Sequence, residues 1–201
     1  MRYSARVVTA LRVAQMIADT EAEGPGRRFA LWVQGCSLRC PGCCNPEMFA
    51  PDRGGEVLDA AVVAARVLAT PGIEGLSVLG GEPFEQPGAV AEVCRAVRAA
   101  GLTVMVYSGY TLEELRARRS PDVDALLAET DLLVDGRYEQ QRPERARRWL
   151  GSTNQRLHFL SGRMRADDAR FSAPNTVELR LEGGRLTING WPAAAEAFRR
   201  R

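Results

Sequence analysis

The sequence predicts an α/β fold built on a mostly parallel sheet, and three observations lead to this prediction. The composition, with 45% hydrophobic and 26% charged residues among 201, is typical of a globular chain that can bury one core. Short apolar runs alternate with amphipathic helical patterns, and the connections between them are short. Because parallel neighbours need a crossover, usually a helix, this alternation favours repeated βα units.

The predicted strands are apolar runs bounded by turn residues. We expect them over residues 29–34, 76–79, 102–107, 132–134 and 157–160. Two helices are expected between these runs, over residues 56–69 and 87–100. The first ends at a Thr-Pro-Gly turn and the second at Gly101, which can adopt the left-handed cap.

Two further helices are marked by their first turns. Thr111 and Glu114 form a capping box at the start of one, and Ser120 precedes the other, with Pro121 in its first position. After residue 163 the pattern changes to a β-hairpin, over 176–181 and 186–189 with Gly183-Gly184 as its turn, and an Arg-ended tail from Pro192. We therefore predict a domain over residues 1–162 and an extension over 163–201 packed on it.

Charge and hydropathy exclude several classes of function. The formal net charge is +2, from 27 basic and 25 acidic residues, which predicts no nucleic-acid or anionic-membrane partner. All basic residues are Arg, so Schiff-base chemistry and a lysine-dependent P-loop are excluded. No apolar stretch has the length of a membrane span, and residues 1–20 lack a secretory core, so we expect a cytoplasmic protein.

The strongest motif is a cysteine loop directly after the first predicted strand. Cys36, Cys40 and Cys43 form a C-x3-C-x2-C pattern, and in a reducing compartment such crowding indicates metal rather than disulfides. Three thiolates on one loop can bind three irons of a [4Fe-4S] cluster. The fourth iron would remain open to an exogenous ligand, which predicts chemistry rather than a structural role.

A zinc knuckle or a closed cluster is the alternative interpretation, with Cys44 or Cys94 as fourth ligand. Cys43 and Cys44 are adjacent, so binding both to one centre would strain the loop, and no second cysteine pair exists elsewhere. Cys94 lies within an apolar helical pattern, which is typical of a buried structural cysteine.

A second motif, Gly80-Gly81-Glu82-Pro83, ends the predicted strand 76–79. Glycines at a strand end usually form a turn, but they also let a ligand approach the backbone, and Glu82 offers a negative partner for an ammonium group. Both motifs follow strands, and in parallel α/β folds the carboxyl edge of the sheet carries the functional site.

With these two motifs the sequence resembles the radical S-adenosylmethionine superfamily, and within it the activating proteins of anaerobic ribonucleoside-triphosphate reductase. The resemblance spans roughly residues 17–156. It rests on residues 23–28, 40–46, 80–84, 107–111, 134–138 and 151–156.

The resemblance implies a partial (β/α)6 TIM-like barrel with Cys36, Cys40 and Cys43 as iron ligands. S-adenosylmethionine would bind the fourth iron, and Gly80, Gly81, Glu82 and Pro83 would hold its amino group. Ser108 is a further candidate contact to this cofactor, with a solvated turn serine as the alternative. Asn154 and Gln155 could orient a ligand or bond their own loop.

Other positions depart from the family pattern or lie outside it. Cys44 stands where relatives more often carry Tyr or His, and the residues after 156 lie beyond the resemblance. We expect a structural or surface role for His158, the only histidine. The cluster of Arg142, Arg145, Arg147 and Arg148 is interpreted as a solvated helical face rather than a dock for an acidic partner.

The implied function is reductive cleavage of S-adenosylmethionine to a 5′-deoxyadenosyl radical, which would generate a glycyl radical on an anaerobic ribonucleotide reductase. A flavodoxin or ferredoxin-type protein would supply the electron. The alternatives are a radical enzyme that modifies a small molecule or peptide, such as a deazapurine synthase, and a non-catalytic iron–sulfur or zinc protein.

Overall fold

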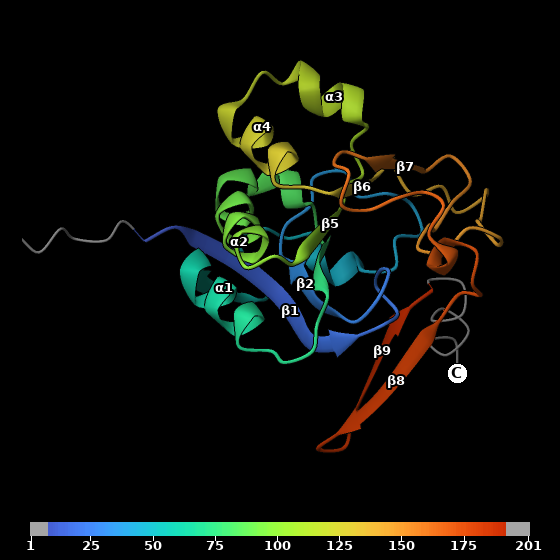
Figure 1. Cartoon of the computed structure of the whole chain (residues 1–201), viewed down its shortest axis with the longest axis horizontal. Helices are drawn as coiled ribbons and strands as arrows, with labels where there is room; N and C mark the ends of the chain where they lie inside the picture. The colour runs from blue at the N-terminus through green and yellow to red at the C-terminus, as the bar shows by residue number, and fades with distance from the viewer. Residues whose placement is uncertain (1–7, 192–201) are drawn as a thin grey trace, which may run out of the picture.

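A seven-stranded sheet forms the centre of the molecule in the computed structural model, which describes residues 8–191 (Figure 1). The strand order is β3-β1-β2-β4-β5-β6-β7. The strands are β1 (Ala10–Thr20), β2 (Arg28–Val33), β3 (Glu56–Asp59), β4 (Gly75–Gly80), β5 (Thr103–Tyr107), β6 (Leu132–Asp135) and β7 (Arg156–Phe159). The four central strands β2, β4, β5 and β6 are parallel, and the pairs β1/β2, β1/β3 and β6/β7 are antiparallel.

This topology confirms the predicted α/β class with a largely parallel sheet, although the parallel part of the described chain has four strands rather than six. Strand β1 has no counterpart in the prediction. It pairs with β2 on one side and β3 on the other, so it joins the parallel part of the sheet to its edge. Strand β7 matches the predicted run 157–160 but runs antiparallel to β6.

Helices α1 (Ala60–Leu68), α2 (Pro87–Ala99) and α4 (Pro121–Ala128) lie together along one side of the sheet (Figure 1). Helix α3 (Leu112–Ala117) precedes α4 and begins with the predicted capping box: the Glu114 amide donates to Thr111 Oγ1 at 3.2 Å, and the Thr111 amide donates to the Glu114 carboxylate at 2.8 Å. Gly101 follows α2 with a φ of +86°, as its predicted role in ending the helix requires.

The predicted helix over residues 56–69 is wrong in its first turn. Residues 56–59 form β3, which pairs with β1. The helix begins only after Asp59, whose carboxylate accepts a hydrogen bond from the Ala61 amide at 3.0 Å. Pairing with β1 and this N-cap together decide where the helix starts.

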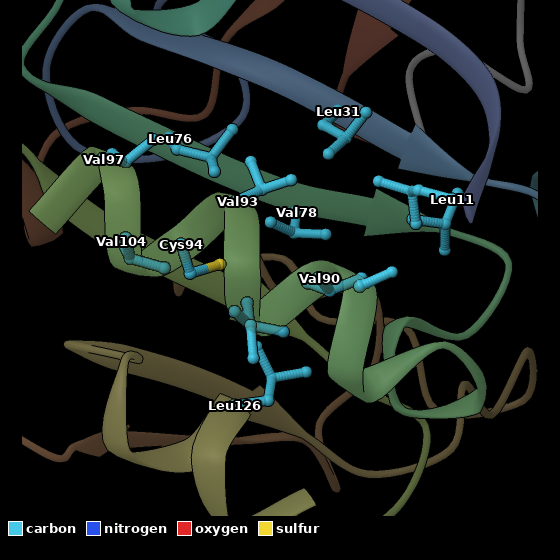
Figure 2. Packing of buried hydrophobic residues seen from close by; sticks show 14 of the residues in the cluster. Leu11, Leu31, Leu76, Val78, Val90, Val93, Cys94, Val97, Val104 and Leu126 are labelled. Atoms are coloured by element: carbon cyan, nitrogen blue, oxygen red, sulfur yellow. The ribbon is translucent and has the colours of Figure 1, made fainter. Parts of the chain in front are cut away.

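The main core lies between the helices and the sheet (Figure 2). From α2, Val90, Val93 and Cys94 pack toward Leu76 and Val78 of β4. Cys94 is completely buried, and burial raises the pKa of its thiol. It is therefore a core residue, as its apolar pattern predicted.

The opposite face of the sheet carries two smaller apolar clusters. One contains Trp32, Met48 and Leu79, and the other contains Met105 and Trp149 with its neighbours. Leu150, Met164 and Phe171, which follow β6 in the sequence, pack in the second cluster. Trp32, Met48, Leu79 and Trp149 from these two clusters also line the cavity in which the functional residues meet.

The predicted C-terminal hairpin is confirmed as β8 (Val177–Glu182) and β9 (Arg185–Gly190), which form a separate two-stranded sheet. Gly183 and Gly184 make its turn with φ values of +55° and +78°, the conformation of a type I′ hairpin. Three short 3-10 helices, η1 (Pro46–Met48), η2 (Pro83–Glu85) and η3 (Ala169–Phe171), complete the elements. The tail from Pro192 lies outside the described residues.

Candidate functional site

The two sequence motifs meet at the carboxyl edge of the parallel strands, around a cavity of about 240 Å³. The cysteine loop follows β2, Gly81 and Glu82 follow Gly80 at the end of β4, and Ser108 follows β5. All of these segments contribute lining residues. Parallel strands bring their carboxyl ends to one edge, so residues far apart in the sequence share one site.

Four of the five cysteines line this cavity. Cys36, Cys40, Cys43 and Cys44 are partly exposed there, and none forms a disulfide. The loop bends sharply between them, because Arg39 and Gly42 both have positive φ, at 47° and 74°. These bends allow one short loop to turn several thiols toward the same space.

Backbone amides surround the thiol sulfurs. The amides of Leu38 and Arg39 point at Cys36, the Tyr138 amide points at Cys40, and the Asn45 amide donates to Cys43 Sγ at 3.4 Å. Burial raises the pKa of the Cys36 thiol to about 11 and also raises that of Cys40. A bound metal centre would instead lower the pKa of these thiols, because a cysteine sulfur binds metal as the thiolate.

This donor set fits an iron–sulfur cluster. Thiolates are the usual ligands of such clusters, and hydrogen bonds from amides to their sulfurs tune the reduction potential. Within residues 8–191, no three Cys, His, Asp or Glu side chains are grouped as closely as a single metal ion requires. A four-iron cluster takes each thiolate on a different iron, so its ligands are spread more widely than those of one ion.

Gly80 and Gly81 place their loop against the start of the cysteine loop. The Gly81 amide donates to the Val33 carbonyl and the Glu82 amide to the Gly35 carbonyl, both at 2.7 Å. A Cβ atom on Gly81 would overlap the Gly35 backbone, and one on Gly80 would lie 2.6 Å from backbone atoms of Val33. The two glycines therefore bring the two motifs together.

Glu82 is a buried carboxylate held by three donors. Its Oε1 accepts from the Phe84 amide at 2.9 Å and the Ser108 hydroxyl at 3.0 Å, and its Oε2 accepts from the Gly109 amide at 2.8 Å. Only 1% of Glu82 is exposed, and burial raises its pKa to about 7. An ammonium group in the cavity would stabilise the charged form.

Ser108 is 5% exposed, so it is not a solvated turn serine. It donates to Glu82 and accepts from the Tyr110 amide at 3.0 Å, and thus fixes the Glu82 side chain. Pro83 is buried and begins η2 directly after Glu82.

Asn154 and Gln155 bond their own loop and its neighbour. The amide nitrogens donate to the carbonyl oxygens of Arg137 at 2.7 Å and Gly136 at 3.0 Å. Gln155 also lines the cavity, but its Oε1 accepts from the Gly151 and Ser152 amides. These contacts agree with the loop-bonding alternative.

The prediction for His158 agrees with the structure, whereas the prediction for the arginine cluster does not. His158 lies 2.9 Å from the buried carboxylate of Asp135, beside β6, which agrees with a structural role. The arginine cluster is not on a helix, because residues 139–150 form an irregular loop, with a bridge between Pro143 and Ser152. Three of its members have partners: Arg142 pairs with Glu139 at 3.2 Å, Arg147 pairs with Glu144 at 2.6 Å, and Arg148 lies over the Trp149 ring.

Several lining residues were missed by sequence reasoning. Glu23, Trp32, Tyr107 and Trp149 line the cavity, as do Ile188, Asn189 and Trp191 of the C-terminal extension. Trp32 and Tyr107 lie near the ends of predicted strands, which could have suggested them. The extension supplies lining residues only because it packs against the segment after β1. No local sequence pattern indicates this packing.

Fold and site together define a class: an α/β protein that carries a thiol-rich cofactor loop at the carboxyl edge of a parallel sheet. Residues 22–158 match the family model of the 4Fe-4S single cluster domain. The chain belongs to this family, in its radical S-adenosylmethionine branch, and is related to the anaerobic ribonucleoside-triphosphate reductase-activating proteins. Membership implies one [4Fe-4S] cluster and S-adenosylmethionine as cofactors.

The similarity to individual relatives covers most of their length. The activating protein of Salmonella typhimurium is 32% identical over 145 residues, which is 68% of this chain and 91% of that protein. The activating protein of Enterobacteria phage T4 is 31% identical over 141 residues, 67% of this chain and 85% of that protein. Among solved structures, QueE from Escherichia coli aligns over 51% of this chain and 53% of its own with a TM-score of 0.41 and 14% identity.

No helix within the described range has the length and hydrophobicity to cross a membrane.

Proposed function

We propose that Cys36, Cys40 and Cys43 bind three irons of the cluster and that Cys44 lines the cavity without binding iron. The spacing of the three thiols on one loop supports this assignment, as do the amides that point at their sulfurs. When bound, the cluster and S-adenosylmethionine supply the one-electron cleavage that yields a 5′-deoxyadenosyl radical.

Glu82 would bind the amino group of S-adenosylmethionine. Its burial and its three hydrogen-bond donors hold the carboxylate in one orientation. A cation that binds in the cavity therefore meets a carboxylate that is already oriented and need not move. Ser108 acts as a positioning residue for Glu82. Gly80 and Gly81 keep this carboxylate close to the cysteine loop through their contacts with Val33 and Gly35.

The reaction that we propose is generation of a glycyl radical on an anaerobic ribonucleotide reductase. The observation that carries this proposal is the 32% identity to an activating protein over 91% of its length. We place the chain in the cytoplasm, with a flavodoxin or ferredoxin-type electron donor. Residues 1–162 would form the catalytic domain, with residues 163–201 as an extension.

The test is electron paramagnetic resonance on an anaerobic ribonucleotide reductase from the same organism, after anaerobic incubation with cluster-loaded protein, S-adenosylmethionine and reduced flavodoxin. We expect a doublet that collapses to a singlet when the reductase contains α-deuterated glycine. A Cys40→Ala variant provides the matched control and should give no signal. Accumulation of 5′-deoxyadenosine without this doublet would instead favour a small-molecule or peptide substrate.

A further inference from the structure

The β-hairpin of the C-terminal extension has one apolar face and one polar face. Residues that lie opposite each other in the register of β8 and β9 share a face, and so do residues two apart along one strand. The apolar face therefore carries Val177, Leu179, Leu181, Leu186 and Ile188. Among the described side chains, the other face carries Glu178, Arg180, Glu182, Thr187 and Asn189. This pattern is typical of a hairpin that covers an apolar surface.

The polar face, however, is the one that is fixed to the end of β1. Glu178 accepts from the Glu21 amide at 2.7 Å, and Asn189 Nδ2 donates to Thr20 Oγ1 at 2.9 Å. Arg180, on the same face, also donates to a backbone carbonyl at the end of β1. The apolar face is thus turned away from this anchor, and the hairpin projects from the rest of the molecule (Figure 1).

Three leucines of the apolar face are exposed. Leu179, Leu181 and Leu186 have 53%, 73% and 55% of their surface exposed. They are three of the seven large hydrophobic side chains that are exposed among residues 8–191, and the register places them next to one another. Single exposed leucines are common on protein surfaces, but a contiguous group of them indicates an interaction surface.

The apolar face begins at the cavity of the functional site. Ile188 lies opposite Leu179 in the ribbon, is partly buried, and lines the cavity together with the cysteine loop. Leu186 and Leu181 lie two residues further along the two strands, which is a distance of about 7 Å. A polypeptide that places one residue in the cavity and continues past Ile188 would therefore meet the exposed leucines within a few residues.

From this continuity we propose that the apolar face of the β8–β9 hairpin docks an apolar segment of the polypeptide substrate, next to the residue that enters the cavity. The proposal rests on the proposed function, because it takes the substrate to be a polypeptide. The family model ends at residue 158, so the hairpin lies outside the shared domain. The extension would thus serve substrate recognition rather than cofactor chemistry.

The size of the face argues against a second copy of this chain as its occupant. Two strands of six residues form a ribbon about 20 Å long and about 10 Å wide, so one face offers on the order of 200 Å². A stable interface between two proteins buries about 800 Å² on each partner. The face is too small to hold a dimer alone, but it can add to the contact that a substrate makes in the cavity.

The chemistry of the face selects an apolar segment. Its side chains are all aliphatic, so a charged segment would lose water there without gaining a hydrogen bond or an ion pair. Aliphatic or aromatic residues of the substrate would instead remove the exposed leucine surface from water. The contact should therefore depend little on salt concentration.

The test is the affinity of the cluster-loaded protein for an anaerobic ribonucleotide reductase from the same organism, measured by anaerobic calorimetric titration with S-adenosylmethionine present. The hairpin variant is Leu181→Thr/Leu186→Thr, which removes apolar surface and keeps residues that favour strands. We expect it to bind the reductase about tenfold more weakly, or worse, than the wild type. Its iron content and thermal midpoint should equal those of the wild type, because both leucines are exposed.

The matched control is Val62→Thr/Leu68→Thr on α1. These side chains are 43% and 45% exposed, so the control also removes two exposed apolar groups, but on the helical layer of the molecule. Its affinity for the reductase should equal that of the wild type. Equal affinity of the hairpin variant and the wild type would overturn the proposal.

Other occupants of the face would give other results. A wild type that sediments as a dimer and a hairpin variant that sediments as a monomer would assign the face to a second copy. A lowered thermal midpoint in the hairpin variant, matched by Phe198→Ser in the tail and not increased when the changes are combined, would assign it to the chain's own tail. Either result would overturn the proposal.

Failure of the proposed function would look different. If the reductase binds neither the wild type nor the variants and never shows the doublet, the proposed function and the docking surface are both wrong. If the reductase shows the doublet and binds the wild type and the hairpin variant equally, only the docking surface is wrong.

Discussion

The Glu82 amide donates a 2.7 Å hydrogen bond to the carbonyl oxygen of Gly35, and this contact joins the two motifs of the site. Gly35 precedes the first cysteine of the loop, and Glu82 is the buried carboxylate of the second motif. A displacement of one loop must therefore displace the other. The relative position of the cysteine loop and the Glu82 carboxylate therefore depends on backbone packing as well as on the side chains that would bind the cofactors.

Gly81→Ala should disturb this junction, because the added Cβ would overlap the carbonyl oxygen of Gly35 and lie 2.7 Å from its carbonyl carbon. We expect a loss of about 1–3 kcal/mol in the free energy of unfolding, as for an overpacked core, and reduced iron loading. Gly162→Ala, where no atom lies within 4 Å of the new Cβ, should change neither quantity. Denaturant unfolding and iron analysis of both variants check this.

Arg28 should contribute strongly to stability, although it has no carboxylate partner among the described ion pairs. Its buried guanidinium donates to Ser77 Oγ, the Leu76 carbonyl and Thr103 at 2.6–3.1 Å, which ties β2 to β4 and β5. Burial lowers its pKa to about 10, so it remains charged at neutral pH.

Arg28→Met would leave these buried acceptors without donors, and we expect a loss of about 3 kcal/mol in the free energy of unfolding. Arg27→Met is the comparison, since Arg27 is exposed and pairs with Asp19. It should shift the unfolding midpoint little. Equal midpoints for the two variants would refute the role of Arg28.

Glu82→Gln should retain the cluster but weaken S-adenosylmethionine binding, because it removes the charge and keeps the shape. The expected loss is about 1.5–3 kcal/mol, typical of a hydrogen bond to a charged group. Calorimetric titration of cluster-loaded protein measures it. Glu92→Gln on α2 serves as control, and unchanged affinity in Glu82→Gln would contradict the role proposed for this carboxylate.

Stability should fall as the pH rises from about 5 to about 7 because of Glu23. Burial raises its pKa from 4.5 to about 7, against the hydrogen bonds from Gly190 and Asn189, and the nearby Glu178 adds to the increase. Between these two pH values the folded state retains a proton that the unfolded state has lost, so rising pH favours unfolding.

Glu23→Gln removes this dependence, since the variant has no proton to lose. The thermal midpoint of the variant relative to the wild type should therefore rise with pH over this range, corresponding to a change of up to about 3 kcal/mol in the free energy of unfolding. A constant difference between the two proteins from pH 5 to 7.5 would show that Glu23 titrates normally.

Much of the parallel core could be predicted from the sequence, because buried parallel strands are continuous apolar runs and the helices between them begin at a proline or a capping box. Strand β1 was missed although Leu11, Val13 and Ile17 alternate in part. Its pairing with β2 contains register shifts, which break the period of two that marks a strand. The start of α1 was misplaced because residues 56–59 pair with β1, a contact that no local pattern reveals.

The candidate site could be predicted only where its functional residues lie close together in the sequence and form a short motif. The cysteine loop and Gly80 to Glu82 are such motifs, and the structure brings them to one cavity. The wall formed by the extension depends on contacts such as that between Glu23 and Gly190, which are 167 residues apart in the sequence. The loop around Trp149 has an irregular backbone, with a φ of 62° at Trp149, and no helical period predicts it.

Iron and sulfide analysis of anaerobically reconstituted cysteine variants tests the central claim most directly. The wild type, Cys44→Ala and Cys94→Ala should each bind about four irons per chain, and Cys36→Ala, Cys40→Ala and Cys43→Ala should each lose the cluster, because three loop thiolates hold it and one iron stays open. A cluster that survives in Cys40→Ala but is lost in Cys44→Ala would contradict the account.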